Sequence, residues 1–406
     1  MKKKSIYRFL IPVLMLCTGV GLNGGDFFEL KKGILNNTWK KIAFFYFTPA
    51  LTLENMGYTS NIFSYQEFEE PDWTADLGLD LLVSVILGNR FVLSLKEKPY
   101  YSLYAKHVEQ RALNNRLKTS VHTYLGRMNL EYSYNNDYIR GRPTSEFGAN
   151  IRVRTNEHFF AVDYGSYKNL FLNLFIKQNH IKHFEENYLG NFNLIQYMNR
   201  KELHAGLRLN KNIFTQTRLF IEFEYYEYRF ANSPLRDGIG RRASIGVAFP
   251  EIGRIRGSVE FGLKRFLPNS SFYRTYSKPF GSGEVSIRLL RRFKFDFQYL
   301  VNNFYSYWSE DQSFDERSAG SRVEYYMNRN IKIGYNYHLG ILSYENMNDG
   351  NKTRQDKFYT SAVYVGVKVY KKMGIGLEYR RYRADSDVLS FSRNNDFIGG
   401  YLIHEF

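Results

Sequence analysis

The chain has 406 residues, a formal net charge of +16, 34 phenylalanines, 34 tyrosines and only 9 prolines. This composition favours strands, because aromatic side chains suit a pleated surface, and a mean hydropathy of −0.44 excludes a bundle of membrane-spanning helices. The single cysteine, Cys17, lies near the N-terminus, so disulfides and cysteine metal sites are excluded from the rest of the chain.

Residues 1–25 have the pattern of an export signal peptide. A basic segment, an apolar segment and a run of small residues follow one another, at 2–8, 9–17 and 19–25. We therefore predict that the mature chain begins near Asp26. Cys17 would also allow a lipoprotein, which the bulky Leu16 disfavours. Residues 26–41 are predicted to be a periplasmic tether, with a plug or a helix as the alternative.

From residue 42 onwards, segments of about ten residues alternate between apolar and polar side chains. In the clearest example, Phe293, Phe295 and Phe297 lie on one face and Lys294, Asp296 and Gln298 on the other. The alternation recurs at 202–209, 256–264, 331–338, 359–369 and 375–379. Such a pattern does not suit a soluble core but suits a wall between lipid and water. We predict an all-β fold, a single antiparallel transmembrane β-barrel over residues 42–406.

Tight turns and longer polar stretches alternate along this region. The tight turns are predicted near residues 88–90, 126–127, 156–157, 210–212, 251–253, 290–291, 328–330 and 371–372. The longer stretches include residues 66–75, 139–145, 231–240, 309–318 and 345–356. The resulting hairpins, with one strand before and one after them, predict about 18 strands and both termini at the rim with tight turns. Residues 158–200 fit either one long strand or an extra hairpin. A barrel of about 16 or about 20 strands is therefore the alternative to about 18.

Closure of the sheet is a chemical requirement, because lipid offers no partner for a backbone N–H or C=O at a sheet edge. The chain ends at Phe406. A terminal phenylalanine on a last strand resembles the signal that outer-membrane proteins present to the barrel assembly machinery. His404 and Gly400 share its outward face and depart from the usual apolar choice. We expect a barrel in the bacterial outer membrane, in contact with lipid and lipopolysaccharide.

The polar faces of the strands carry charges of both signs, which require a wet interior. The predicted pore-lining residues are Arg152, Arg154, Glu202, Arg208, Glu222, Glu224, Arg256, Glu260, Lys264, Arg288, Lys294, Asp296, Arg322, Glu324, Lys332, Glu378 and Arg380, and Glu131 lies on the same kind of face. Alternatively, these side chains pair across neighbouring strands and only stiffen the wall.

The net positive charge of the chain has several possible explanations. Export makes nucleic acid an implausible partner, which leaves anionic lipopolysaccharide, an anionic polysaccharide, or a cationic lumen that concentrates anions. Basic residues could also be spread over turns and wall without a particular partner.

No residue pattern indicates a catalytic site, a cofactor or a metal. His180, His183, Glu185 and Glu186 have a spacing that a metal could use, but such a cluster is more often a solvated face. A barrel enzyme acting on lipids would need a serine beside a histidine on neighbouring strands, and nothing in the sequence selects such a pair. The chain is therefore not predicted to be an enzyme.

Three motifs in the first quarter of the chain carry a resemblance to a known family. They are PALTL at 49–53, GYTSNIF at 57–63 and the stretch 104–115 ending in RALNN. They resemble the outer-membrane β-barrel porin family associated with exopolysaccharide and capsule export. Thr59 departs from the acidic residue often found there. The resemblance implies a barrel of about 18 strands that secretes a polymer together with periplasmic export components.

We therefore expect an outer-membrane pore that passes polar solutes and serves the export of extracellular or capsular polysaccharide. A general diffusion or anion-selective porin is the first alternative, and a lipid-modifying barrel enzyme or a plugged structural barrel are others. A long inward-folding loop that narrows the pore, together with trimeric association, would favour the porin, whereas an open lumen and a polysaccharide operon would favour the exporter.

Overall fold

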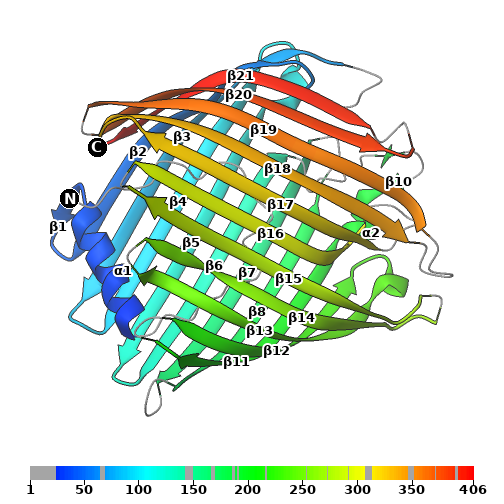
Figure 1. Cartoon of the computed structure of the whole chain (residues 1–406), viewed down its shortest axis with the longest axis horizontal. Coiled ribbons are helices and arrows are strands. Elements are labelled where there is room, and N and C mark those ends of the chain that lie inside the picture. The colour runs from blue at the N-terminus through cyan, green and yellow to red at the C-terminus, as the bar shows by residue number, and fades with distance from the viewer. Residues whose placement is uncertain are drawn as a thin grey trace.

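The computed structural model of the chain describes residues 24–64, 69–141, 150–165, 170–184, 188–189, 192–214, 217–252, 254–271, 273–290, 292–306, 313–345, 352–370, 372–388 and 392–406. Within these residues, 18 long antiparallel strands form one closed barrel (Figure 1), as predicted. In chain order they are β2 (Phe45–Thr59), β3 (Asp72–Leu87), β4 (Phe91–Tyr104), β5 (Ala112–Leu125), β6 (Met128–Gly141), β7 (Ile151–Gly165), β8 (Leu170–His183), β11 (Arg200–Asn212), β12 (Arg218–Phe230), β13 (Gly238–Ile252), β14 (Ile255–Pro268), β15 (Tyr276–Leu289), β16 (Phe293–Tyr305), β17 (Ser313–Tyr326), β18 (Ile331–Glu345), β19 (Lys352–Tyr370), β20 (Met373–Ser386) and β21 (Arg393–Glu405).

The barrel closes where the last strand meets the first. Each strand pairs with its chain neighbours, β8 pairs with β11 across a long connection, and β21 pairs with β2. Gly88 and Gly126 have positive φ angles of 58° and 67° in two of the predicted tight turns. Among described helices, none is long and apolar enough to cross a bilayer.

One predicted turn is wrong. Residues 156–157 lie inside β7, which pairs along its length with β6 and β8. Asn135 donates a hydrogen bond to Glu157, and Lys177 forms an ion pair with it at 3.3 Å. These polar residues therefore belong to a wall that is hydrophilic on its inner side. The doubtful stretch 158–200 contains the end of β7 and the whole of β8, which gives 18 strands among the described residues.

The predicted long loops are shorter in the structure, because strands continue beyond the apolar zone. Strands β3, β17 and β19 begin at Asp72, Ser313 and Lys352, each inside a predicted loop. The connection between β8 and β11 holds the short hairpin β9 (Tyr188–Leu189) and β10 (Phe192–Asn193) and helix α2 (Leu194–Met198). Two 3₁₀ turns, η2 (Val108–Gln110) and η3 (Pro234–Arg236), occupy other connections at the same rim.

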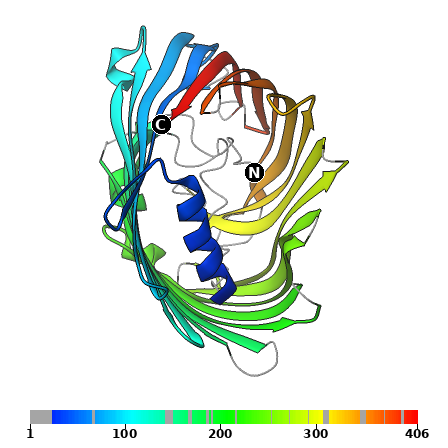
Figure 2. The ribbon, with the colours of Figure 1, turned by 90° about the vertical axis from the view of Figure 1, so that its left-hand side faces the viewer.

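The first described element is a helix, in the region for which the sequence leaves a tether, a plug or a helix open. Helix α1 (Gly24–Asn37) lies across the inside of the ring at the rim with tight turns (Figure 2), and β1 (Lys40–Ile42) then pairs with β2. Phe27 and Ile34 are buried against Val92, and Phe27 stacks on Tyr124. Lys31 Nζ donates hydrogen bonds to the turn between β3 and β4. The export signal lies outside the described residues, apart from its last two.

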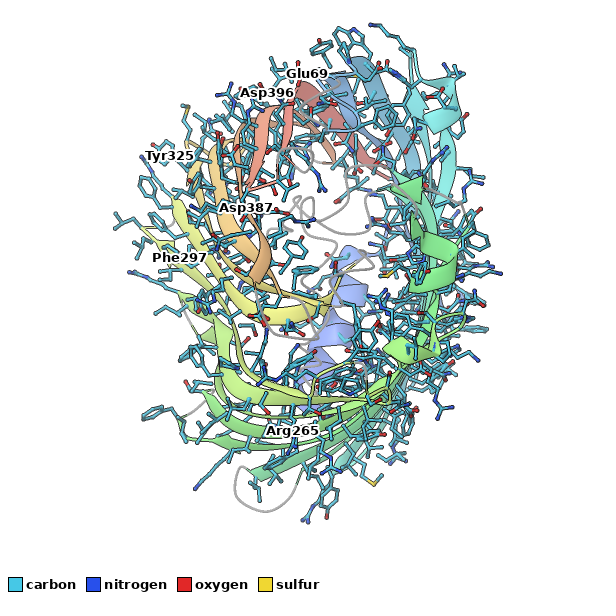
Figure 3. All side chains as sticks on the ribbon, turned by 90° about the vertical axis from the view of Figure 1, so that its right-hand side faces the viewer. Glu69, Arg265, Phe297, Tyr325, Asp387 and Asp396 are labelled. Atoms are coloured by element: carbon cyan, nitrogen blue, oxygen red, sulfur yellow. The ribbon has the colours of Figure 1, made fainter. Side chains whose placement is uncertain are left out.

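The contacts of α1 identify the inner face of the wall. Val92 touches α1, and directly paired residues on neighbouring strands share a face, so His122 and Glu131 also point inward. Side chains of the opposite parity point away from the lumen. Figure 3 shows Phe297 and Tyr325 directed outward, and Leu263 and Leu377 are 66% and 72% exposed. Such exposure of large apolar side chains requires a lipid surrounding.

Candidate functional site

The strand register places the predicted charged residues on two different faces. All of them point into the lumen except Arg152 and Arg154. The inward set is Glu131, Glu202, Arg208, Glu222, Glu224, Arg256, Glu260, Lys264, Arg288, Lys294, Asp296, Arg322, Glu324, Lys332, Glu378 and Arg380.

Arg152 and Arg154 point outward, contrary to the prediction. Arg154 pairs with Tyr138 of β6, whereas Ala161 of the same strand β7 pairs with the inward Glu131. Both guanidinium groups lie over the Tyr138 ring, at 5.7 and 5.8 Å. The end of β7 towards the long loops is polar on both faces, so polarity alone does not identify the lumen side there.

Arg242 is the centre of the densest charge cluster in the lumen. Its guanidinium contacts Glu222 at 2.7 Å, Glu224 at 2.7 Å and Glu260 at 3.2 Å. Arg208 binds Glu222 from the other side at 2.5 Å. These carboxylates are almost fully buried, and charged groups at such positions need close partners of opposite sign.

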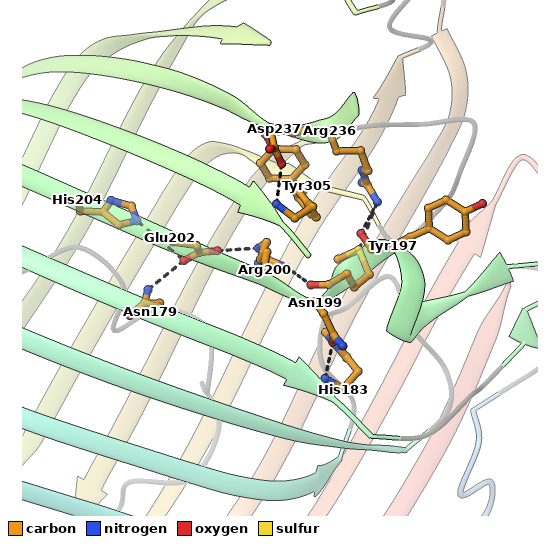
Figure 4. A network of polar contacts seen from close by, with 12 residues as sticks. Asn179, His183, Tyr197, Asn199, Arg200, Glu202, His204, Arg236, Asp237 and Tyr305 are labelled. Atoms are coloured by element: carbon orange, nitrogen blue, oxygen red, sulfur yellow. Dashed lines mark hydrogen bonds and ion pairs between the residues drawn. The ribbon is translucent and has the colours of Figure 1, made fainter. Parts of the chain in front are cut away.

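The cluster continues towards the loop rim through β11 (Figure 4). His204 Nδ1 lies 2.6 Å from Glu224, and Arg200 contacts Glu202 at 2.8 Å. Asn179 of β8 donates a further hydrogen bond to Glu202. The side chains therefore form a continuous polar layer over five neighbouring strands, β8 and β11 to β14.

A second cluster surrounds Glu324 on the opposite part of the wall. Lys332 contacts this carboxylate at 3.1 Å, and the hydroxyl groups of Tyr326 and Tyr364 donate hydrogen bonds to it. Lys294 bridges Asp296 at 2.5 Å and Glu324 at 3.9 Å. Here too the lumen charges are largely matched by their neighbours.

Acidic and basic side chains are present in about equal numbers on the inner faces of the described strands. The net charge of +16 must therefore lie mainly elsewhere: on outward faces, in turns and in the basic N-terminal segment. A strongly cationic lumen does not follow from this arrangement.

The loop-side end of β16 separates from β15 and folds into the lumen, while β17 stays paired with both β16 and β18. Strand β15 pairs with β16 only as far as Gly281 and Val301, whereas β16 and β17 remain paired up to Tyr305 and Ser313. We call this segment, residues 302–305 and 313–316, the inward hairpin end. In Figure 2 the yellow strands of this region reach towards the middle of the ring.

Polar bonds attach one face of the inward hairpin end to β14 and β15. Lys264 Nζ donates to Asn302 Oδ1 at 2.8 Å and to the Asn303 carbonyl at 2.6 Å. The Tyr276 hydroxyl donates to Asn303 Oδ1 at 2.6 Å, and Lys278 contacts Asp315 at 2.7 Å. These bonds cross the gap that the missing backbone pairing leaves.

Aromatic side chains cover both faces of the same segment. Tyr305 packs edge-on against Tyr228 and Phe266 of β12 and β14, with ring centroids 5.1 and 5.8 Å apart. On the other face, Phe304 and Phe314 join a buried cluster with Leu342, Tyr344 and Phe358. Apolar burial on both sides fixes the segment inside the lumen.

Arg236 of η3 connects three loops at this end of the barrel (Figure 4). Its guanidinium donates to the carbonyls of Ser306 at 2.6 Å and Tyr197 at 3.2 Å, and lies over the Phe230 and Tyr305 rings. Asn199 next to α2 accepts a hydrogen bond from the His183 backbone. The connection β8–β11, η3 and the end of β16 are thus held together at the inner side of the rim.

The lumen is therefore narrowed at two levels, by α1 at the tight-turn rim and by the inward hairpin end at the loop rim, with a charged wall between them. Sequence reasoning missed Arg242, Arg236 and the inward hairpin end. The alternation of Ala243, Ile245 and Val247 would have identified Arg242 as inward. For Arg236 and the hairpin end, no local pattern exists, since both depend on contacts between distant loops.

The histidines of the candidate metal site do not lie together in the structure. His180 points outward and His183 inward, and Glu185 and Glu186 lie outside the described residues. In the part of the chain that the structure describes, no group of three metal-binding side chains is found.

Comparisons with known proteins match folds only. No family model and no curated protein sequence matches the chain. Among solved structures, OccAB3 of Acinetobacter baumannii superposes with a TM-score of 0.50 at 12% identity, over 89% of this chain and 99% of that one. The outer membrane protein OpdK of Pseudomonas aeruginosa gives 0.50 at 13% identity, over 89% and 98%.

A longer chain is also matched, the FrpB iron transporter of Neisseria meningitidis, with a TM-score of 0.47 and 10% identity. The match covers 87% of this chain and 63% of the transporter. Together with the apolar outer face and the charged inner face, the fold identifies the protein as a β-barrel of the bacterial outer membrane.

Proposed function

We propose that the protein is a porin-type channel for small, hydrated polar solutes of low net charge. The observation that carries this proposal is the inward hairpin end, which narrows a lumen lined with ionic and hydrogen-bonding groups. A channel selects by its diameter and by the groups that line it. A constriction favours passage of small solutes over passage of a polymer.

The near balance of positive and negative charge in the lumen supports a preference for solutes of low net charge. Arg242 and Glu324 are each surrounded by groups of opposite sign, so the wall offers many donors and acceptors without a strong net field. We expect weak selectivity between anions and cations.

The expectation of polysaccharide export rests on the resemblance in the first quarter of the chain. The comparisons do not link the chain to that process, and the inward hairpin end is the feature that favours a porin instead. A deletion strain separates the two functions. Loss of surface polysaccharide would support export, whereas slower uptake of small solutes with unchanged surface polymer would support the porin.

Purified protein in planar bilayers and in liposomes tests the proposal directly. Single-channel conductance reports whether the lumen conducts, and liposome swelling with saccharides of increasing length reports its size limit. We expect steady conductance and a swelling rate that falls steeply between monosaccharides and longer oligosaccharides. Absence of conductance, or equal rates for all lengths, would contradict the proposal.

A variant of the inward hairpin end sharpens this test. Lys264→Met with Tyr276→Phe removes the bonds to Asn302 and Asn303, so we expect higher conductance and entry of longer saccharides. Lys332→Met is the matched control, because it removes a lumen lysine that binds Glu324 and not the hairpin end. If both variants change the size limit equally, the inward hairpin end does not set it.

A further inference from the structure

A row of basic side chains lies on the outer face of the barrel, at the loop side of its apolar surface. We call it the outer basic row; it consists of Arg140, Arg152, Arg154, Lys182, Lys201, Arg229, Arg241 and Arg265, contributed by β6, β7, β8 and β11 to β14. Arg265 is labelled in Figure 3. The parity of these residues is opposite to that of the lumen charges on the same strands.

The row lies on the loop side of apolar side chains that face lipid, as two strands show. On β8, the side chains of Leu174 and Ile176 are exposed on the outer face. Lys182 lies on the same face, closer to the loops. On β14, Phe261 and Leu263 precede Arg265 with the same two-residue period. The row therefore lies where hydrocarbon gives way to lipid headgroups in the outer leaflet.

The register brings like charges directly opposite one another. Arg140 pairs with Arg152 and Arg154 with Lys182; further along, Lys201 pairs with Arg229 and Arg241 with Arg265. Like charges in direct cross-strand pairs are destabilising in water. An anionic ligand that bridges them would convert this repulsion into attraction.

Carboxylates are scarce along the row. Arg229 contacts Glu227 at 2.5 Å, but Lys201, Arg241 and Arg265 have no acidic partner among the residues that the structure describes. These three side chains are exposed. Tyr138 holds Arg152 and Arg154 over its ring, so the guanidinium groups are also partly oriented.

The opposite side of the barrel provides an internal comparison. At a similar height, Arg381 and Arg383 of β20 both contact Asp396 of β21 at 3.0 Å, and Lys357 pairs with Asp385 in the register. Arg381, Arg383 and Lys357 on that side thus have acidic neighbours, unlike Lys201, Arg241 and Arg265.

We propose that the outer basic row binds the phosphorylated saccharide headgroup of lipopolysaccharide in the outer leaflet. The row crosses seven neighbouring strands, which at about 4.8 Å per strand gives roughly 30 Å of wall. That width accommodates a headgroup with more than one phosphate. Arginine suits this role because its planar donors match phosphate oxygens in pairs. The inference needs the membrane position of the barrel but not its conductance.

Binding of defined glycolipids to the purified full-length protein tests the inference. The probes are lipopolysaccharide with its phosphates intact and the same glycolipid after phosphate removal, each titrated at several salt concentrations. Variant one carries Lys182→Gln, Lys201→Gln, Arg241→Gln and Arg265→Gln. Variant two removes the same number of charges from the opposite sector, through Arg317→Gln, Lys357→Gln, Arg381→Gln and Arg383→Gln.

We expect variant one to lose at least about ten-fold in affinity for the phosphorylated glycolipid, because each basic residue near an anionic surface contributes about five-fold. Variant two should change by less than about two-fold, and the phosphate-free glycolipid should bind wild type no better than it binds variant one. Equal losses in the two variants, or equal affinity for both glycolipids, would overturn the inference.

Two further measurements keep the result interpretable. Heat-modifiable migration in electrophoresis establishes that each variant is folded, and the double variant Arg241→Gln with Arg265→Gln replaces variant one if that protein does not fold. Bilayer conductance should be unchanged in variant one, because the outer basic row faces away from the lumen. Failure of conductance in wild type would contradict the proposed channel and leave the glycolipid result unaffected.

Discussion

Single residues in this barrel owe their role to the face on which they lie. Arg241 and Arg242 are adjacent in sequence, yet Arg242 contacts three lumen carboxylates while Arg241 faces outward opposite Arg265. The alternation of a strand thus gives the same side chain two opposite electrostatic environments.

This contrast predicts unequal effects of the same substitution. Arg242→Gln should lower the free energy of unfolding by about 3 kcal/mol, because it leaves clustered carboxylates without their cation. Arg241→Gln should leave it unchanged or raise it slightly, since it removes a repulsion. Urea unfolding in lipid vesicles measures both. Comparable losses would show that the Arg242 cluster is not a stabilising unit.

His107 is the residue most suited to respond to pH in the loops. It lies between β4 and η2, where burial opposes protonation but hydrogen bonds to Asp72 and Glu70 outweigh it, so its pKa is raised. A raised folded-state pKa means that protonated His107 stabilises the loop below the ordinary histidine pKa of about 6.5. This contribution is lost as pH rises through the folded-state value.

We therefore expect residues 105–111 to become more mobile as pH rises from about 6 to 8. Hydrogen–deuterium exchange of this loop, normalised to the loop at 231–237, measures the change. His107→Gln should remove the pH dependence. If the variant keeps the same profile, another group in the loop titrates.

At the scale of elements, the sequence predicts regular strands well and departures from them badly. The alternation in β16 identified Phe293 to Gln298 correctly, because a wall between lipid and water imposes period two on both faces. The loop end of the same strand could not be predicted, since Asn303 and Tyr305 are defined by contacts with β12, β14 and β15. The position of α1 inside the barrel likewise depends on Val92 and Tyr124, which lie far along the chain.

The pairing of β2 with β21 contains an irregularity that allows a sharp test. The register shifts around Glu54 to Gly57, and Asn55 has a positive φ angle of 48°. A Cβ atom at Gly57 would clash with the backbone of Ile398 and Gly399. Backbone cannot move aside as a flexible side chain can, so only glycine fits there.

Gly57→Ala should therefore lower the free energy of unfolding by about 1–3 kcal/mol. The midpoint temperature of heat-modifiable migration should fall with it. Gly283→Ala is the matched control, because a Cβ atom there meets only ordinary contacts, the nearest at 3.7 Å. An unchanged midpoint for Gly57→Ala would show that the two strands can separate slightly at no cost.

For the whole molecule, the predicted barrel, its strand number and its membrane are confirmed, because backbone pairing in lipid leaves few alternatives. The lining of the lumen was predictable as a class of residues, but Arg152 and Arg154 show that charge without register is ambiguous at a polar rim. The distribution of charge between inside and outside depends on the register of all the strands together.

The joining of β2 to β21 has a consequence for how the chain reaches its native state. Thr59 and Phe397 are register partners across almost the full length of the polypeptide. Contacts between such distant residues form late and slowly. Until they form, two strands expose unsatisfied hydrogen-bonding groups, so the nascent sheet must be shielded from other chains while it waits for its own last segment.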